Sequence, residues 1–426
     1  MLQLMIVSSQ PGSDFEPDAT FSDALGDALG IPDRFRFKFS YVVDKSTMAP
    51  VVPILEYLTF SASNRSNSEN TIKNKTDACY ELFLYLDAIN LDYRDICLEN
   101  LVEYKERLSA YISPKTNRPL AAGTIKARLQ IAREFCVYHK ILPAEPARQL
   151  NSYPVSGRIA ARANGRTSAL NVRSPITLIE YISAEDLRRI MAALGEPPGR
   201  GARRSRDWLI SAFCVSTGAR LDEALGLTIN QIRASATAQP QSKSVVVRLT
   251  RTKRSVPRDI AVDRGMIDLL LEYIDGPRKE AISIGIASRS RRQEPSEVFV
   301  NGPDCAPRYA GLPYQAKRAE EYFAAAQLAI GMTKVVPVYD PDSRQAIGEK
   351  FVNRHTIHHL RHTYAIQAWN VYRDLPETDR WIKIQGQLGH KSHQITADIY
   401  LRAVKHLEGD ARDVMGEYLK TLMVLP

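Results

Sequence analysis

Cysteine is scarce in this chain, which has five cysteines among 426 residues. The five are widely spaced and no two of them form a C-x-x-C pair; they are Cys79, Cys97, Cys136, Cys214 and Cys305. An odd number of scattered thiols argues against a disulfide framework and against a thiolate zinc site. We therefore expect a protein of a reducing, cytoplasmic compartment.

Long apolar runs are missing as well. The chain begins with the mostly apolar segment Met1 to Val7, which then turns polar and has no basic region before it. That segment is too short for the hydrophobic region of a signal peptide or for a membrane span. The sequence thus predicts a soluble protein without a membrane partner.

Acidic residues are outnumbered by basic ones. The chain has 48 Asp and Glu against 57 Lys and Arg, which gives a net charge of +9. Such a surplus favours a polyanionic partner, because each Lys or Arg on a phosphate releases condensed counterions. Many ordinary proteins are equally basic, so charge alone does not identify the partner. With 44% hydrophobic residues, the chain can form two or three packed domains.

Composition and periodicity divide the chain. Residues 1–50 are an appendage of unknown role, in which the strict alternation of residues 34–39 indicates a half-buried strand. Residues 51–150 have apolar side chains at helical spacing and predict a compact, all-helical domain. The expected helices cover residues 51–60, 71–91, 98–112 and 124–138.

Residues 151–176 form a basic linker that has no acidic residue from Ser152 to Ile176. Its arginines stand among Gly, Ala, Ser and Asn; they are Arg158, Arg162, Arg166 and Arg173. This composition is typical of a flexible, cationic tether. The tether either is solvated or lies along the backbone of DNA, and both interpretations stay open.

A second, larger domain is expected over residues 177–412, followed by a tail over residues 413–426. Ser183 is a typical helix N-cap, with acidic residues in the turn behind it. Two short β-branched runs predict a hairpin around Arg251 to Arg254. The expected elements are strands over 244–250, 256–262 and 297–301, helices over 266–275 and 314–330, and an inserted hairpin or extended loop within 302–354.

Polar chemistry is concentrated late in the chain, where seven of the eight histidines lie between His355 and His406. The densest stretch ends in H-x-L-R-H-T, with its arginine at Arg361. An L-G-H sequence and then a tyrosine follow it. Upstream, T-G-A-R ends at Arg220 and is followed by Glu223.

In their order along the chain, these motifs resemble those of the tyrosine recombinase (phage integrase) family. T-G-A-R with Arg220 is similar to the first arginine box of the family, and Lys253 in the predicted hairpin is similar to its hairpin lysine. The H-x-L-R-H-T box with Arg361, the L-G-H box with His390, and Tyr400 complete the set. Each motif is short, but their fixed order is specific.

The resemblance implies a mainly α-helical protein with a small β component. A helical core-binding domain and a mixed α+β catalytic domain, residues 177–412, would close on double-stranded DNA as a C-shaped clamp. DNA would be cleaved and rejoined at specific sites through a 3′-phosphotyrosyl bond to Tyr400, within a tetramer on two DNA sites. The tail packs either on its own domain or on a neighbouring protomer. One departure is that His390 and Tyr400 are ten residues apart, one more than is usual.

Phosphoryl transfer gives the motif residues a physical sense. Its transition state places negative charge on the nonbridging oxygens, which the planar donor forks of Arg220 and Arg361 match. A phenol has an ordinary pKa of about 10, so Tyr400 needs a base as it attacks, and His358 is the candidate. A phosphotyrosine stores the energy of the broken bond. No metal, ATP or other cofactor is therefore expected.

The other polar residues are given lesser roles. His390 is a candidate hydrogen-bond donor to the phosphate, and Lys253 a candidate proton donor to the departing sugar oxygen. Glu223 is expected to orient an active-site arginine. Arg251 and Arg254 are expected to contact DNA.

The remaining histidines are expected to be structural. His359 is assigned to a structural contact and His362 to helix packing, while His393 and His406 are assigned to the surface.

Three other interpretations stay open. A type IB topoisomerase resembles this family in its chemistry, and a non-cutting DNA-binding protein of the same fold would need no nucleophile. The third is a metalloenzyme, because the spacing i, i+3, i+4 and i+7 would give one helical face to His355, His358, His359 and His362. Zinc sites usually add a further ligand and a carboxylate behind the ligands, and neither is obvious in the sequence.

Overall fold

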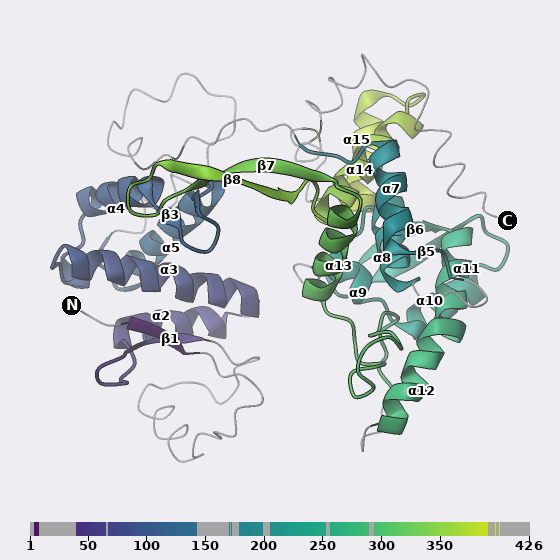
Figure 1. Ribbon diagram of the computed structural model, residues 1–426, viewed down its shortest axis with the longest axis horizontal. Helices are drawn as coiled ribbons and strands as arrows, with labels where there is room; N and C mark the ends of the chain where they lie inside the picture. The colour runs from purple at the N-terminus through teal and green to yellow at the C-terminus, as the bar shows by residue number, and fades with distance from the viewer. Residues whose placement is uncertain are drawn as a thin grey trace. The chain divides into compact units, whose positions relative to one another are not determined.

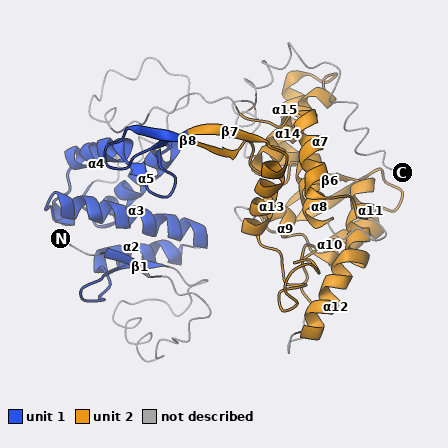
Figure 2. Cartoon of the chain, in the orientation of Figure 1, with its two compact units in different colours: residues 1–176, 337–349 blue, residues 177–336, 350–426 orange. Residues whose placement is uncertain are grey.

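The computed structural model describes residues 4–7, 40–64, 67–142, 170, 172, 179–198, 205–252, 256–288, 294–390, 397 and 400. The chain divides into two compact units, residues 1–176 with 337–349 and residues 177–336 with 350–426 (Figure 2). The described part is mainly helical with small two-stranded sheets, so the predicted fold class is confirmed (Figure 1). None of its helices is long and apolar enough to span a membrane.

The first unit contains the amino-terminal elements. Its helices are α2 (Val52–Ser63), α3 (Glu69–Ala88), the short 3-10 turn η1 (Tyr93–Asp95), α4 (Leu98–Ala110) and α5 (Ala122–Tyr138). Its antiparallel pairs are β1 (Leu4–Val7) with β2 (Tyr41–Asp44), and β3 (Ile112–Ser113) with β4 (Arg118–Pro119). The helices expected in this part of the chain are therefore confirmed. The strand expected over residues 34–39 lies outside the described residues.

Aromatic side chains fill the centre of the first unit. Phe135 of α5 is fully buried and meets Tyr57 and Phe83 edge to face, with ring centroids 5.7 and 5.6 Å away. Lys75 and Glu134 form an ion pair of 2.8 Å beside this group, and both bond the Tyr57 hydroxyl. The apolar positions at helical spacing thus build one core around α5.

The second unit contains the remaining elements. Its helices are α7 (Ala184–Leu194), α8 (Arg206–Thr217), α9 (Leu221–Leu225), α10 (Ile229–Ala238), α11 (Arg264–Tyr273), the π-helical turn η4 (Ile274–Arg278), α12 (Lys279–Ser288), α13 (Ala316–Ala329), α14 (His358–Val371) and α15 (Glu377–Leu388). Its strands β5 (Ser244–Leu249) and β6 (Arg258–Asp263) form the expected hairpin, in which Val245, Val247 and Leu249 face the core. Ser183 caps α7 as expected, since its side chain accepts a hydrogen bond from the Asp186 N–H.

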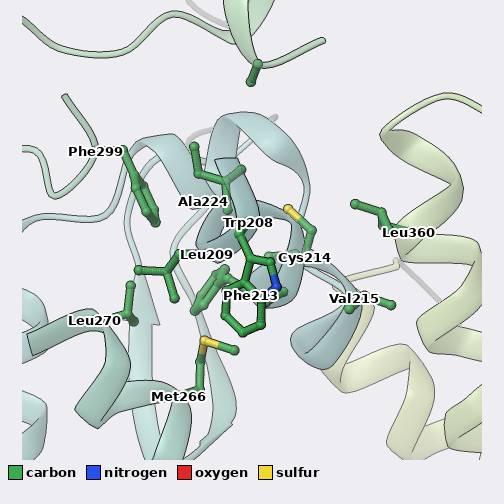
Figure 3. Close-up of a cluster of buried hydrophobic side chains, with 14 of the residues drawn as sticks. Trp208, Leu209, Phe213, Cys214, Val215, Ala224, Met266, Leu270, Phe299 and Leu360 are labelled. Atoms are coloured by element: carbon green, nitrogen blue, oxygen red, sulfur yellow. The ribbon is translucent and has the colours of Figure 1, made fainter. Parts of the chain in front are cut away.

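Helix α8 forms the centre of the second unit. Its residues from Trp208 to Val215 are all buried. A helix that is apolar on every side must be surrounded, and α8 packs against α7, α11, α13 and α14. Figure 3 shows this packing, with Phe213 among side chains that include Leu209, Met266, Leu270, Phe299 and Leu360. The carboxyl end of α8, where the T-G-A-R motif begins, is therefore held firmly.

The strand expected over residues 297–301 is wrong. The backbone there makes only isolated bridges, between Thr228 and Glu297 and between Val300 and Pro313. The Val298 N–H donates to the Leu227 carbonyl, whereas the Phe299 carbonyl accepts from the Tyr314 N–H. Successive residues therefore pair with different segments. No ladder can extend under these conditions, and Pro313 has no N–H to offer.

The insertion within residues 302–354 contains a hairpin, as one of the two expectations held. Strand β7 (Thr333–Tyr339) pairs with β8 (Ala346–Asn353). The turn is closed at Asp340, whose carboxylate accepts from the Ser343 N–H at 2.7 Å. The tip of the hairpin groups with the first unit, where the Tyr339 N–H donates to the Asn117 carbonyl at 2.9 Å.

Candidate active site

The guanidinium of Arg361 joins the ends of two helices. Arg361 lies in the first turns of α14 and is 3% exposed. Its Nη1 donates to the Gly218 carbonyl at 2.5 Å, and its Nη2 to the Leu388 carbonyl at 2.6 Å. These carbonyls close the carboxyl ends of α8 and α15, where helix dipoles favour a cation. One arginine thus ties the T-G-A-R and L-G-H motifs together.

Both glycines at these helix ends have backbone conformations that other residues rarely adopt. Gly218 has φ of +68°, and a Cβ there would lie 2.5 Å from Cδ1 of Tyr364. Gly389 has φ of +67°, and a Cβ there would lie 2.5 Å from Cδ of Arg258. Glycine is needed at each place both for the left-handed turn and for the close approach of a neighbour.

Glu223 holds two arginines at once. Its side chain is 1% exposed and contacts Nη1 of Arg220 at 3.0 Å and Nη2 of Arg258 at 2.7 Å. It also accepts a hydrogen bond of 2.8 Å from the Arg220 backbone N–H at the start of α9. Burial alone would raise the pKa of this carboxyl, but the hydrogen bonds and charges of Arg258 and Arg220 lower it below its ordinary value. Glu223 is therefore an anion that fixes both guanidinium groups.

Positive charge dominates the surroundings. Burial, and then the charge of Arg220, lower the pKa of Arg361 to about 10, so its guanidinium keeps its charge at neutral pH. Arg258, which begins β6, bonds the Gln387 carbonyl next to the L-G-H motif. The carboxylate of Glu223 pairs with Arg220 and Arg258, and its charge also favours the charged form of Arg361. A site with this excess of cations is suited to a phosphate.

Tyr400 lies against α14 and is 1% exposed. Its Oη is 2.9 Å from Nδ1 of His362, one helical turn beyond His358. Burial raises the pKa of Tyr400 to about 12, although the charges of Arg361 and Arg220 oppose the rise. The phenol is thus protonated at neutral pH and already bonded to an imidazole.

Two further histidines border this pair. The ring of His390 lies nearly parallel to that of Tyr400, with centroids 6.4 Å apart. Burial, followed by the charges of Arg361 and Arg220, lowers the pKa of His390 to about 4. His358 is exposed at the start of α14, and its ring is 4.9 Å from that of His362.

The helical face of four histidines, on which the metalloenzyme alternative depended, does not form. Helix α14 begins at His358, so His355 precedes it in the connection from β8. His362 turns to Tyr400, whereas Nδ1 of His359 lies 3.4 Å from Nδ1 of His355. The four side chains therefore divide between two places.

Among the described residues, one group has metal-ligand chemistry. Ligand atoms of Glu180, His355 and His359 lie within 4.8 Å of one another. However, Lys334 Nζ lies 2.9 and 3.0 Å from the two carboxylate oxygens of Glu180. The charge of that carboxylate is already matched, and a metal ion would have to displace the lysine. We assign no metal to this group.

The structure brings most of the sequence-predicted residues together. Arg220, Glu223, Arg361, His390 and Tyr400 lie in one neighbourhood of the second unit, with His358 at its border. The other predicted residues are separate. Arg251 is exposed beside the hairpin, and the residues outside the described part of the chain are Lys253, Arg254, Arg158, Arg162, Arg166 and Arg173.

Sequence reasoning missed two residues of this neighbourhood. Arg258 was not among the predicted site residues, yet its guanidinium contacts the carboxylate of Glu223. His362 had been assigned to helix packing, yet it bonds the tyrosine hydroxyl. A weak sign for His362 was available, because it lies four residues after His358 and so on the same helical face.

The comparisons with known proteins point to one family. Residues 180–406 match the model of the phage integrase family. A comparison with curated proteins gives no match.

Solved structures with a similar fold include three DNA complexes. The XerH site-specific recombinase bound to palindromic difH substrate is 16% identical, with 82% of this chain and 81% of that chain covered and a TM-score of 0.49. The Tn1549 transposon integrase in complex with circular intermediate DNA is 13% identical, with 84% of this chain and 99% of that chain covered and a TM-score of 0.48. A lambda integrase dimer bound to a COC′ core site is 14% identical, with 82% of this chain and 94% of that chain covered and a TM-score of 0.48.

Proposed function

Since the chain belongs to the phage integrase family and is a tyrosine site-specific recombinase, we propose that it cleaves and rejoins duplex DNA through a transient 3′-phosphotyrosyl bond to Tyr400. The observation that supports this most directly is the position of the Tyr400 hydroxyl. It meets a histidine at hydrogen-bond distance, in a site that also contains the guanidinium groups of Arg220 and Arg361.

The arginines bind the scissile phosphate in this proposal. Arg361 is held by two carbonyls and Arg220 by Glu223, so both cations are in place before DNA arrives. Preorganised donors stabilise the charge that develops in the transition state without having to reorganise. His390 adds a hydrogen bond to a nonbridging oxygen. These cations supply the stabilisation for which other phosphoryl-transfer enzymes use a metal ion.

Cleavage forms one bond and breaks another. The Tyr400 oxygen bonds to phosphorus, and the bond from phosphorus to the 5′ oxygen breaks. The 5′ oxygen takes a proton from Lys253, which lies outside the described residues, between β5 and β6. Rejoining is the reverse, so the energy of the phosphodiester is retained and neither ATP nor a metal is consumed.

The DNA partner is a duplex with specific sites. Cationic residues outside the catalytic neighbourhood, Arg251 and Arg254 beside the hairpin and the linker arginines, are proposed to contact its phosphates. Two duplexes would be joined in a tetramer, in which the tail, residues 413–426, exchanges between subunits. Mass photometry of the complex with cleavable DNA tests this stoichiometry, and a complex of one protomer per duplex would contradict it.

The test of the function begins by finding a site. A library of nicked duplexes with randomised sequence is incubated with the protein, and covalent adducts are trapped with SDS and sequenced. Selected duplexes then serve as substrates on denaturing gels. Tyr400→Phe should form no adduct while binding the same DNA within a few-fold, because only one hydroxyl is removed.

The control is Tyr372→Phe, which removes a hydroxyl from a tyrosine at the end of α14 that packs beside the Tyr400 cluster. This variant should retain adduct formation. Adducts that persist in Tyr400→Phe would refute the nucleophile. Relaxation of plasmids that lack a selected site would favour a topoisomerase, and DNA binding without adducts in the unaltered protein would favour a non-cutting protein.

A further inference from the structure

The hydrogen bond between His362 and Tyr400 is unusual in its setting. The Tyr400 side chain is 1% exposed, so its hydroxyl has little access to solvent. The hydroxyl oxygen lies 2.9 Å from Nδ1 of His362. A proton that leaves this hydroxyl during attack therefore has the imidazole as its nearest acceptor.

The imidazole is suited to accept rather than to donate. The pKa of His362 is lowered to about 3, chiefly by burial and then by the charges of His358, His359, Arg361 and His390. The ring is therefore neutral across the physiological range. A neutral ring with its own proton on Nε2 presents a lone pair at Nδ1.

We propose that His362, and not His358, is the general base that receives the Tyr400 proton during DNA cleavage. This inference rests on the proposed function and adds the path of one proton to it. The Tyr400 oxygen bonds to phosphorus, its proton moves to Nδ1 of His362, and the 5′ oxygen departs with the proton of Lys253. In rejoining, the phenolate departs and takes its proton back from the His362 imidazolium, so the base becomes the acid.

The bound phosphate makes this transfer possible. In the free protein, burial, the neighbouring histidines and the charge of Arg361 disfavour a charged His362 ring. A phosphate adds negative charge next to that ring, and the charge of an anion raises the pKa of a nearby imidazole. The ring would accept a proton only once DNA is bound, which prevents a free phenolate in the absence of substrate.

His358 has a different position. It is exposed, and its ring meets that of His362 edge to face, with an interplanar angle of 86° and a centroid separation of 4.9 Å. A side chain at the exposed start of α14 is placed to meet the phosphate from outside. It is therefore assigned to the phosphate, where it donates a hydrogen bond, and the proton of the nucleophile is left to the inner histidine.

The test is the pH dependence of single-turnover cleavage on a nicked duplex. The variants are His362→Asn, whose amide oxygen can reach the position of Nδ1 without taking a proton, and His362→Ala. Both should be about 10²- to 10⁴-fold slower than the unaltered protein at neutral pH. Both should gain rate about tenfold per pH unit on the way to the ionisation of the phenol, whereas the unaltered protein should not.

A substrate with a sulfur at the bridging 5′ position separates the two proton transfers. Its thiolate departs without help, so it should restore a variant of Lys253 but not His362→Asn. His359→Gln is the matched control, since it changes a neighbouring imidazole on α14 that contacts His355 rather than Tyr400. This control should cleave within a few-fold of the unaltered protein. Addition of imidazole should accelerate His362→Ala, which shows that the variant is folded.

Some results would overturn the assignment. Cleavage by His362→Asn within a few-fold of the unaltered rate would reduce His362 to a positioning role. The pH slope appearing in His358→Gln instead would make the outer histidine the base. Failure of the proposed function is distinct, because the unaltered protein would then form no adduct at all.

Discussion

The carboxylate of Glu223 should be worth more to the stability of the second unit than any exposed acid. It is 1% exposed and contacts Arg220 and Arg258, whose side chains are 27% and 13% exposed. Glu223→Gln keeps the shape but removes the charge, and a neutral amide cannot accept from both guanidinium groups. Leaving buried cations without their anion costs about 3–5 kcal/mol. For a unit of this size, Tm should fall by roughly 6–20 °C.

The chain provides its own assay and control. All three tryptophans, Trp208, Trp369 and Trp381, lie in the second unit, so tryptophan fluorescence follows the unfolding of that unit alone. The control is Glu321→Gln, which removes an ion pair of the same 3.0 Å length between side chains that are 66% and 46% exposed. Exposed pairs contribute about 0–1 kcal/mol. Equal losses in the two variants would refute the argument from burial.

The comparison of the unaltered protein with Glu223→Gln also gives a pH test. The pKa of Glu223 is lower in the folded state than the ordinary value of about 4.3. Its contribution is therefore complete above that ordinary value and is lost as pH falls through the folded pKa. Glutamine does not titrate there. The difference in unfolding free energy between the unaltered protein and Glu223→Gln should thus narrow below about pH 4, and a constant difference would mean that charge is not its source.

Other predictions address the glycine turns, the central arginine and metal ions. Gly218→Ala should destabilise the second unit by about 2–5 kcal/mol in tryptophan-monitored unfolding. The backbone at φ of +68° costs about 1–2 kcal/mol, and the clash of the new Cβ with Tyr364 at 2.5 Å adds about 1–3 kcal/mol. The control Gly331→Ala, with the same φ and nothing within 4 Å, should show the backbone cost alone. Arg361→Lys should lose about 1.5–3 kcal/mol, because an ammonium cannot bond the Gly218 and Leu388 carbonyls as a fork, and single-turnover cleavage should fall with it; a variant with unchanged stability would contradict this role of the fork. Treatment with EDTA should leave cleavage unchanged, because fixed cations stabilise the phosphate; strong inhibition would direct attention to Glu180, His355 and His359.

Much of the fold could be predicted because local patterns agreed with the packing. The helices α2 to α5 followed from apolar residues at helical spacing, and the β5–β6 hairpin followed from two β-branched runs around a polar turn. The strand over residues 297–301 failed because β-branched composition says nothing about which backbone is available as a partner. Its neighbours Thr228 and Pro313 come from two separate segments, and that pairing is decided by tertiary contacts.

For the site, too, the sequence indicated the residues of local motifs but not their tertiary contacts. Residues with side-chain chemistry in short motifs, such as Arg220, Arg361 and Tyr400, could be named from the sequence, because the motifs state which side chains are present. What the motifs do not state is which groups those side chains meet. Arg361 bonds backbone carbonyls, and every residue has a carbonyl, so no residue type marks Gly218 or Leu388 as its acceptors. Only the left-handed glycines at both helix ends indicate that two chain turns converge there.

His362 illustrates why a choice between neighbouring histidines needs the structure. His358 and His362 share one face of α14, so spacing alone favours neither. The decision depends on depth, because the outer position is exposed and the inner one is next to a buried phenol. Depth along a helix is set by what packs against it, here the cluster that contains Tyr400, Trp369 and Leu388. A base that must receive a proton from a buried hydroxyl belongs at the inner position, since a proton moves across a direct hydrogen bond more readily than through an intervening ring.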